Sequence, residues 1–281
     1  MIRPRKLLVF DLETVPDVAL ARELWGEACE GLGDAAVTQL IWDRMKEQNF
    51  GGSEFPRLPF HRIVAIGCLL ASIEEVDGFE SYHLERLGCI GEENDDEAAL
   101  VQAWYDYGAK CMRAGTPVRL VGFNSRGFDV PCIKIRALKH GVKASWLFQA
   151  GDKWSNYGAR YDAVWHVDLL DALGDHGAAR GVGRLDEVCT LAGLPGKMDI
   201  EGSKVGKLFA AGEVGLIRDY CETDVLNTYL LYLKYQHLAG YVTAGALAKE
   251  EAHVREYLLK DDSKGHLVAF EEAWKKGFKD D

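Results

Sequence analysis

Short apolar runs along the chain predict five β-strands. They lie at residues 7–13, 62–72, 78–84, 118–122 and 163–169. Asp77 and Gly78, between the second and third runs, are typical of a hairpin turn, so these two strands are expected to be neighbours. The first run is apolar on both of its faces, as expected for a strand buried on both sides of a sheet.

Apolar residues that recur with helical spacing predict eight helices. They are expected at residues 19–25, 35–46, 98–114, 131–139, 185–192, 204–211, 214–239 and 243–259. The less regular segment 17–60 is interpreted as an insertion, and the charged end beyond Lys260 is expected to fray. Strands first, followed by alternating helices and strands, predict a mixed α/β sheet with helices packed on it.

Composition places the chain among folded proteins. Its 281 residues are 48% apolar and 27% charged, which disfavours disorder, collagen-like repeats and coiled coils. Thirty-three basic and 44 acidic residues give a formal net charge of −11. This charge argues against non-specific coating of duplex nucleic acid, because such binding relies on many phosphate contacts. Any contact with nucleic acid is therefore expected to be local.

The cysteines and the N-terminus bear on the cellular compartment. Seven scattered cysteines lack the CxxC spacing of zinc or redox sites, which favours reduced thiols in a cytoplasmic protein. The chain starts with three basic residues before an apolar run, as signal peptides do, but Asp11 and Glu13 interrupt that run. No stretch approaches the ~20 apolar residues needed to cross a bilayer, so no membrane contact is expected.

Two carboxylates lie at the end of the first predicted strand. Side chains alternate in a strand, so Asp11 and Glu13 share a face with the apolar Leu7 and Val9. Burying an unpaired carboxylate costs several kcal/mol. Either a positive group lies opposite these acids, or they mark the point where the strand meets solvent.

Two more acids follow other structural signals. Asp129 lies in the sequence NSRGFDVP, after a predicted strand and a turn, and a helix cap is its alternative role. Asp224 ends the sequence YCETD and shares a helix stripe with Tyr220 and Thr228, which directs it toward the core. A neighbouring lysine or arginine is the alternative partner for Asp224.

Together these acids predict a metal site. A formal charge of −4 is carried by the four of them: Asp11, Glu13, Asp129 and Asp224. Two divalent cations would cancel this charge, and oxygen ligands favour Mg²⁺ or Mn²⁺ over zinc. Two such ions about 3.5–4 Å apart can hold the attacking and leaving oxygens of a displacement at phosphorus. The set therefore predicts a two-metal phosphoryl-transfer site.

Three ordered motifs link the chain to a nuclease family. It resembles the DEDD 3′–5′ exonucleases, in the subgroup with a tyrosine in the third motif (DEDDy), through FDLET, NSRGFDVP and YCETD. The likeness is strongest to the proofreading domain of family-B DNA polymerases, whose motifs are DIET, NxxxFD and YxxxD. The segments HVDLLDAL, GLPGK and DVLNTYLLYLKYQ resemble the stand-alone, polymerase-B-like predicted 3′–5′ exonucleases of bacteria. Three motifs in order make this resemblance specific.

The resemblance implies a fold and a division of the chain. It implies an RNase H-like domain over residues 1–240, with the insertion at about 17–60, followed by a C-terminal helical extension with a charged tail over 241–281. No polymerase domain accompanies the motifs. The resemblance therefore favours processing of 3′ ends over proofreading within one chain.

The resemblance also assigns roles to residues. It implies that the four acids bind two Mg²⁺ or Mn²⁺ ions and that Tyr220 orients the attacking water. Asn124 and Phe128, from the second motif, are expected to support Asp129 and to stack on a terminal base or sugar. Asp168 lies where the family also tends to have an acid, but a cap for the following helix explains it equally well, and it stays outside the predicted metal set.

Basic and aromatic side chains are interleaved between residues 131 and 161. They are Lys134, Arg136, Lys139, Lys143, Lys153, Arg160, Trp146, Phe148, Trp154, Tyr157 and Tyr161. Cations that follow phosphates and rings that stack on bases are typical of single-strand binding, so Lys143 and Trp154 are predicted to contact nucleic acid. The alternative is that the tryptophans are core residues and the lysines a solvated helix face.

The predicted function is that of a metal-dependent 3′–5′ exonuclease acting on the 3′ ends of single-stranded DNA. A 3′–5′ exoribonuclease is the alternative within the same chemistry, because the carboxylates act on phosphate and not on the 2′ hydroxyl. A non-catalytic nucleic-acid-binding subunit is the alternative from another class. The intact set of acids and tyrosine argues against this last alternative, because a scaffold has no use for uncompensated buried carboxylates.

Overall fold

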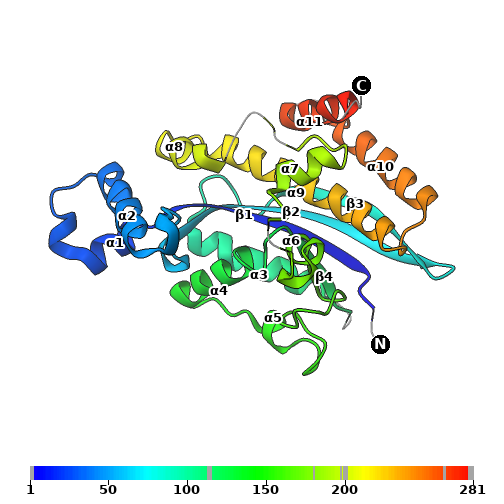
Figure 1. Ribbon diagram of the computed structural model, residues 1–281, viewed down its shortest axis with the longest axis horizontal. Coiled ribbons are helices and arrows are strands. Elements are labelled where there is room, and N and C mark those ends of the chain that lie inside the picture. Colours follow the sequence, from blue (N-terminus) through cyan, green and yellow to red (C-terminus); the bar gives the residue numbers. More distant parts are fainter. Residues whose placement is uncertain are drawn as a thin grey trace.

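A five-stranded mixed sheet forms the centre of the protein (Figure 1). The computed structural model describes residues 3–112, 116–179, 181–196, 198, 202–261 and 264–277. The strands are β1 (Lys6–Pro16), β2 (His61–Val76), β3 (Phe79–Cys89), β4 (Val118–Gly122) and β5 (His166–Asp168). Their order is β3-β2-β1-β4-β5. β2 is antiparallel to β1 and β3, whereas β1, β4 and β5 run parallel to one another.

This order and these strand directions are those of an RNase H-like fold, which confirms the expected fold class. The predicted strands are all present, and β4 has the predicted bounds. β1 and β2 extend beyond their apolar runs, because they continue to pair as far as Pro16 opposite His61. β5 is shorter than predicted, since its ladder with β4 ends after three residue pairs.

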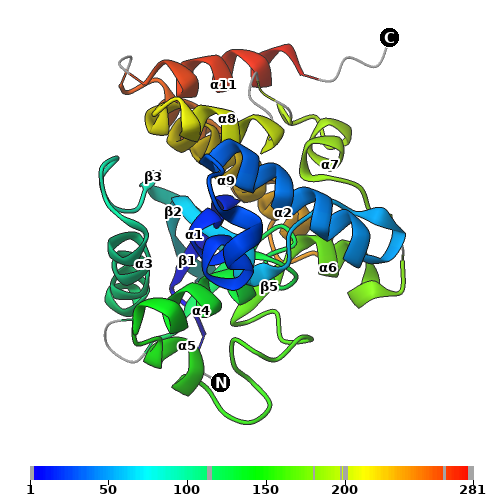
Figure 2. The ribbon, with the colours of Figure 1, turned by 90° about the vertical axis from the view of Figure 1, so that its left-hand side faces the viewer.

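Helices cover both faces of the sheet (Figures 1 and 2). They are α1 (Val18–Trp25), α2 (Asp34–Gln48), α3 (Glu97–Cys111), α4 (Asp129–His140), α5 (Ser145–Gln149), α6 (Leu169–Leu173), α7 (Leu185–Leu191), α8 (Val205–Ala210), α9 (Val214–Leu238), α10 (Ala244–Leu258) and α11 (Gly265–Lys276). The sequence pattern did not predict α5 and α6, because five residues are too few to show helical periodicity. None of the helices in the described ranges is long and apolar enough to span a membrane.

β1 lies between two apolar clusters. Leu7 and Val9 belong to a cluster shared with α9, α10 and α11, and Leu8 and Phe10 to a cluster shared with α3 and α4. All four side chains are almost completely inaccessible to solvent. The alternation predicted for the first strand is therefore confirmed, and the site at its end rests on a core that packs both faces.

The end of the chain forms a packed helix over its described part. Leu267, Phe270 and Trp274 of α11 are buried in the same cluster as Leu7. The expectation that the chain frays beyond Lys260 was therefore wrong for residues 264–277. These apolar residues are spaced three and four apart and define one face of a helix. The charged residues around them lower the average hydrophobicity of the segment, so the sequence pattern did not show this face.

The insertion after β1 projects beyond the end of the sheet (Figures 1 and 2). α1 and α2 pack on each other around a small core that includes Ala21 and Ile41. Arg136 of α4 ties this insertion to the body of the protein. Its buried guanidinium donates to Asp17 at 2.7 Å and also to Glu97, so one cation joins the start of the insertion to α3 and α4.

Candidate active site

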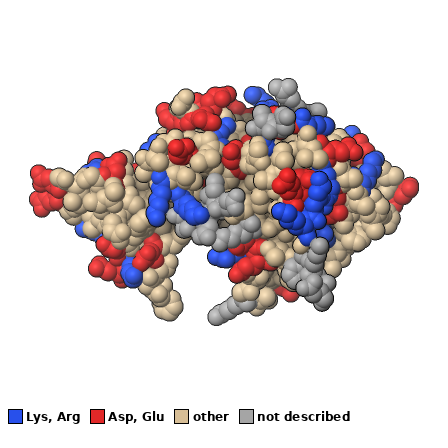
Figure 3. Space-filling model, turned by 90° about the horizontal axis from the view of Figure 1, so that it is seen from above, with Lys and Arg blue, Asp and Glu red and all other residues tan. Residues whose placement is uncertain are grey.

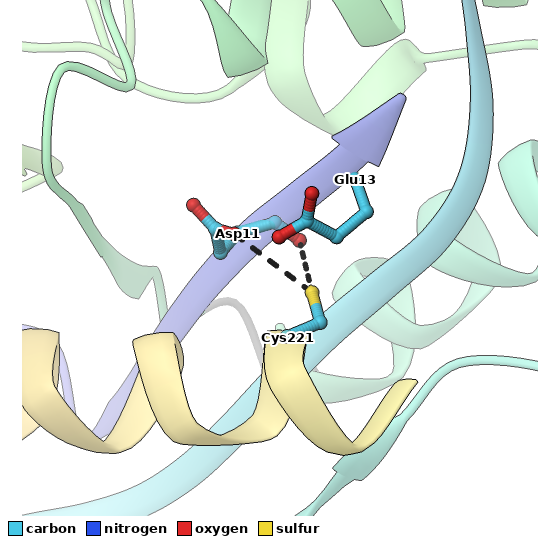
Figure 4. Close-up of side chains that lie close together, drawn as sticks. All are labelled: Asp11, Glu13 and Cys221. Carbon is cyan, nitrogen blue, oxygen red and sulfur yellow. Dashed lines mark hydrogen bonds between the residues drawn. The ribbon is translucent and has the colours of Figure 1, made fainter. Parts of the chain in front are cut away.

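Asp11 and Glu13 lie on β1, and Cys221 lies opposite them on α9 (Figure 4). One ligand atom from each of the three residues lies within 4.8 Å of the others. Glu13 is only 8% exposed, and Asp11 is partly buried. The face of β1 that buries Leu7 and Val9 thus continues as a carboxylate face where the strand passes α9.

Gly67 of β2 sets the approach of α9 to this face. A Cβ atom at Gly67 would lie 2.8 Å from Val225 Cγ2 and 2.9 Å from Cys221 Sγ. The backbone N–H of Gly67 donates to Cys221 Sγ at 3.1 Å, and that sulfur lies 3.8 Å from Asp11 Oδ2. The missing side chain at Gly67 therefore lets α9 come close enough to bring the third motif to β1.

Asp129 reaches the site through a sharp turn between β4 and α4. Asn124 has a φ of +62°, a left-handed conformation that asparagine tolerates better than most residues. The chain then turns through Gly127 and places buried Asp129 at the first position of α4. The N–H of Leu12 donates to Asp129 Oδ1 at 3.1 Å, which joins the second motif directly to β1 between its two acids.

Asp224 and Tyr220 lie one turn apart on α9. The Tyr220 hydroxyl lies close enough to the Asp224 carboxylate to lower the pKa of that acid. Both side chains are half-buried, while Ile217 and Thr228 on the same stripe are fully buried. The predicted orientation of this stripe is confirmed, and Asp224 lies close enough to Asp11 and Glu13 to raise the pKa of both.

The four carboxylates have raised pKa values. Burial raises the pKa of Asp129 to about 7 and that of Asp224 to about 6. Burial also raises the pKa of Asp11 and of Glu13, and repulsion by the other acids raises both further. Within the described part of the chain, no lysine or arginine forms an ion pair with any of the four. Their mutual repulsion is therefore not offset by an ion pair with any basic side chain that the structure describes.

These donors fit hard divalent cations. Carboxylate oxygens from β1, α4 and α9 are the ligands that Mg²⁺ and Mn²⁺ prefer. Cys221, which the sequence did not single out, does not change this set. Its interaction with Cys89 and burial raise the pKa of its thiol, and the thiol donates to the Asp11 carbonyl at 3.5 Å. Its position inside the third motif was visible, but its approach to Asp11 depends on the packing at Gly67.

Asp168 and His166 have structural roles at the end of β5. Asp168 accepts hydrogen bonds from the N–H groups of Asn124 at 2.8 Å, Arg126 at 2.8 Å and Leu170 at 3.0 Å. It therefore caps α6 and holds the turn that leads to Asp129. His166 is buried and shares a hydrogen bond of 2.9 Å with Ser125 in the same turn. The structural alternative for Asp168 agrees with these contacts.

The interleaved stretch 131–161 divides into core and surface residues. Lys143 and Trp154 are exposed, with 79% of Trp154 accessible, so the core alternative does not hold for this tryptophan. Arg136 and Tyr157 are buried and cannot contact a substrate. Neither was among the predicted nucleic-acid contacts, and Arg136 pairs with Asp17 and Glu97, which are distant from it in the sequence.

Phe128 faces the insertion rather than the carboxylates. Its ring centroid lies 4.9 Å from that of His61 and 5.6 Å from that of Phe55. Phe128 directly precedes Asp129, and Asn124 lines the same cavity as Phe55 and Phe128. The predicted substrate contacts of the second motif thus lie between the carboxylates and the insertion. Phe55 was not predicted, because nothing in its own sequence context points to Phe128.

One family of known proteins matches most of the chain. The family described as predicted 3′–5′ exonucleases related to the exonuclease domain of PolB matches residues 53–274. This range includes the sequences around Asp129 and Asp224 and begins after Asp11 and Glu13. Comparison with curated proteins gave no match.

Two solved structures are similar to the chain in part. The family B DNA polymerase from the hyperthermophilic archaeon Pyrobaculum calidifontis is 22% identical, with a TM-score of 0.46, over 80% of this chain and 24% of the polymerase. A product-bound structure of exonuclease I is 12% identical, with a TM-score of 0.31, over 84% of this chain and 48% of exonuclease I. The chain thus spans less than half the length of either protein.

The family match extends from the insertion to α11 and contains the second and third motifs. The first motif, on β1, is joined to the second by the hydrogen bond between Leu12 and Asp129. The chain therefore belongs to the family of predicted 3′–5′ exonucleases related to the exonuclease domain of PolB.

Proposed function

We propose that this protein is a metal-dependent exonuclease that hydrolyses phosphodiester bonds at the 3′ end of single-stranded DNA. One observation carries the proposal: carboxylates from three distant segments converge, with raised pKa values, on a site where no described lysine or arginine pairs with them. Such a cluster repels a polyanionic substrate unless cations reverse its charge.

The acids divide between two cation positions in this proposal. Asp11, Glu13 and Asp224 would hold one Mg²⁺ or Mn²⁺, and Asp11 and Asp129 the other. When bound, two such ions supply an activated water and stabilise charge on the leaving 3′ oxygen. The chain itself keeps the acids at fixed positions, through the Leu12 hydrogen bond to Asp129 and the close packing of α9 on Gly67.

Tyr220 is suited to orienting the attacking water. Burial and the neighbouring acids raise the pKa of its hydroxyl, so the group stays protonated at neutral pH. A protonated hydroxyl can donate a hydrogen bond or accept one, but it is a poor base for removing a proton. It interacts with Asp224, one of the proposed ligands, and this interaction supports a role beside the water that would be activated.

The substrate contacts proposed are local. Asn124 and Phe128 lie beside Asp129, and Lys143 and Trp154 lie further along the surface. Figure 3 shows one face of the protein, on which basic side chains gather in separate groups with acidic ones around them. This face, which is that of α8, α10 and α11, shows basic side chains only in separate groups.

The direct experiment uses the purified chain with Mg²⁺ or Mn²⁺ and three 5′-labelled substrates: single-stranded DNA, duplex DNA and RNA. We expect a ladder of products shortened from the 3′ end of single-stranded DNA, and no ladder in EDTA. Asp224→Asn is the matched inactive control. Degradation of RNA faster than of single-stranded DNA would indicate an exoribonuclease instead. If none of the three substrates is cleaved, the proposal is contradicted.

A further inference from the structure

A cleft of about 540 Å³ lies between the insertion and the turn before α4. The insertion contributes Phe55 and Arg57 to its lining, and the turn contributes Asn124 and Phe128. Asp129, a proposed metal ligand, directly follows Phe128 in the chain. The turn that carries Asn124 and Phe128 therefore connects the cleft to the proposed active site. The projecting insertion forms the opposite wall of the cleft.

Phe55 is exposed in spite of its contacts. Its ring centroid lies 4.8 Å from that of His61 and 5.6 Å from that of Phe128, yet 59% of the residue remains accessible to solvent. An aromatic side chain that served only to pack the insertion on the body would be buried, as Phe60 is at 7%. Phe55 therefore leaves an open apolar surface at the cleft.

Among the described residues that line this cleft, Arg57 alone is charged. Its guanidinium donates to Gln48 at 2.7 Å, and no described acid forms an ion pair with it. Arg57 thus places a positive charge at the cleft in a chain whose net charge is −11. Positive charge along a groove together with aromatic rings is what proteins use to bind single-stranded nucleic acid.

We propose that this cleft is a subsite for an unpaired nucleotide of the substrate strand, whose base stacks on Phe55 and whose phosphate pairs with Arg57. The inference rests on the proposed function and deepens it. A base inside a duplex already stacks on its neighbours and cannot be inserted without unpairing. The subsite therefore favours single strands over duplexes.

The first test is an abasic scan of the substrate. Single-stranded oligonucleotides carry one abasic nucleotide at each of the four 3′-terminal positions in turn, and KM and kcat are measured for each. For the wild-type protein, KM should rise about tenfold at one position, in line with the loss of one stacked base. Phe55→Ala should raise KM for the intact strand by a similar factor and should no longer distinguish that position.

Two further variants make the assignment specific. Phe55→Trp keeps an aromatic surface and should retain the abasic profile. Phe50→Ala is the matched control, because Phe50 is fully exposed in the same insertion and does not line this cleft. It should leave KM unchanged. Arg57→Ala should reduce the slope of log KM against log salt concentration by about 0.7, the share of one phosphate contact on a single strand.

The outcomes separate the subsite from the proposed function. Hydrolysis of bis(p-nitrophenyl) phosphate, which carries no base, reports on the carboxylate centre alone. If the wild type cleaves neither this ester nor any oligonucleotide, the proposed function fails. If it cleaves both, but Phe55→Ala leaves KM for single strands unchanged, the subsite is refuted. A rise in KM that is the same for every abasic position also refutes it, because Phe55 would then only hold the insertion in place.

Discussion

At the scale of residues, the carboxylates were predictable where a local pattern placed them. Asp11 and Glu13 continue a strand face that begins with two fully buried apolar residues, so alternation alone directs them inward. Cys221 and Arg136 were not predictable in the same way. The position of Cys221 depends on how closely α9 approaches β2, and Arg136 pairs with acids more than 35 residues away in the sequence.

Tyr220→Phe tests the role of a single hydroxyl. The substitution keeps the ring and its packing and removes only the hydroxyl, which interacts with Asp224. If the hydroxyl orients the attacking water, kcat should fall by about 10²-fold or more, while KM and Tm change little. Tyr241→Phe, on an exposed tyrosine, is the control and should be neutral. A Tyr220→Phe protein with wild-type kcat would leave Tyr220 as a packing residue.

The raised pKa values predict how stability depends on pH without metal. Burial raises the pKa of Asp129 to about 7 and of Asp224 to about 6, against about 3.9 in an unfolded chain. Between these values the folded protein binds protons that the unfolded chain has released, so the free energy of unfolding falls as the pH rises from about 4 to about 7. We therefore expect the Tm of the metal-free protein to fall over this range.

Thermal unfolding at pH 5 and pH 8, with and without Mg²⁺, measures this effect. Mg²⁺ should raise the Tm more at pH 8, because ionised carboxylates bind it better and ligand binding stabilises the folded state. Asp129→Asn should weaken the dependence on pH, since the amide does not titrate. A metal-free Tm that rises between pH 5 and pH 8 would be the opposite of what this centre requires.

At the scale of elements, the sequence predicted types and order better than lengths. β4 and the start of α9 are as predicted, since a run of apolar residues and a long helical stripe define them locally. β5 and α11 differ from the prediction. The length of β5 depends on how far it pairs with β4, and the apolar face of α11 is surrounded by charged residues that obscure it in the sequence. Nor did any local pattern specify the contact of α9 with β2 at Gly67.

Gly67→Ala tests whether this contact positions the third motif. The new Cβ would meet Val225 and Cys221 at less than 3 Å, so α9 must move away from β1. We expect a loss of about 1–3 kcal/mol in the free energy of unfolding, as for overpacked cores, together with reduced kcat. Gly245→Ala is the control, because nothing lies within 4 Å of the Cβ it would add. Equal stability and activity of the Gly67 variant would show that α9 is not held by this approach.

At the scale of the whole molecule, an acidic protein is proposed to act on an acidic polymer. The formal charge of −11 opposes binding of nucleic acid at long range, and the carboxylate centre opposes it most strongly. In the proposed function, bound cations would remove this barrier at the centre, and the turn before α4 and the insertion would supply the local contacts. The fold serves this arrangement by bringing β1, α4 and α9 together at one end of β1, beside the projecting insertion (Figure 1).

The central claim is that the four carboxylates form a cation-dependent catalytic centre for 3′ hydrolysis. The most direct measurement follows shortening of a 5′-labelled single-stranded oligonucleotide as Mg²⁺ is added back after EDTA, for the wild type and for Asp11→Asn. The wild type should be inactive in EDTA and gain a stepwise 3′ ladder as Mg²⁺ rises, whereas Asp11→Asn, with an unchanged or higher metal-free Tm, should stay inactive. Cleavage in EDTA, or near-wild-type cleavage by a folded Asp11→Asn protein, would contradict the claim.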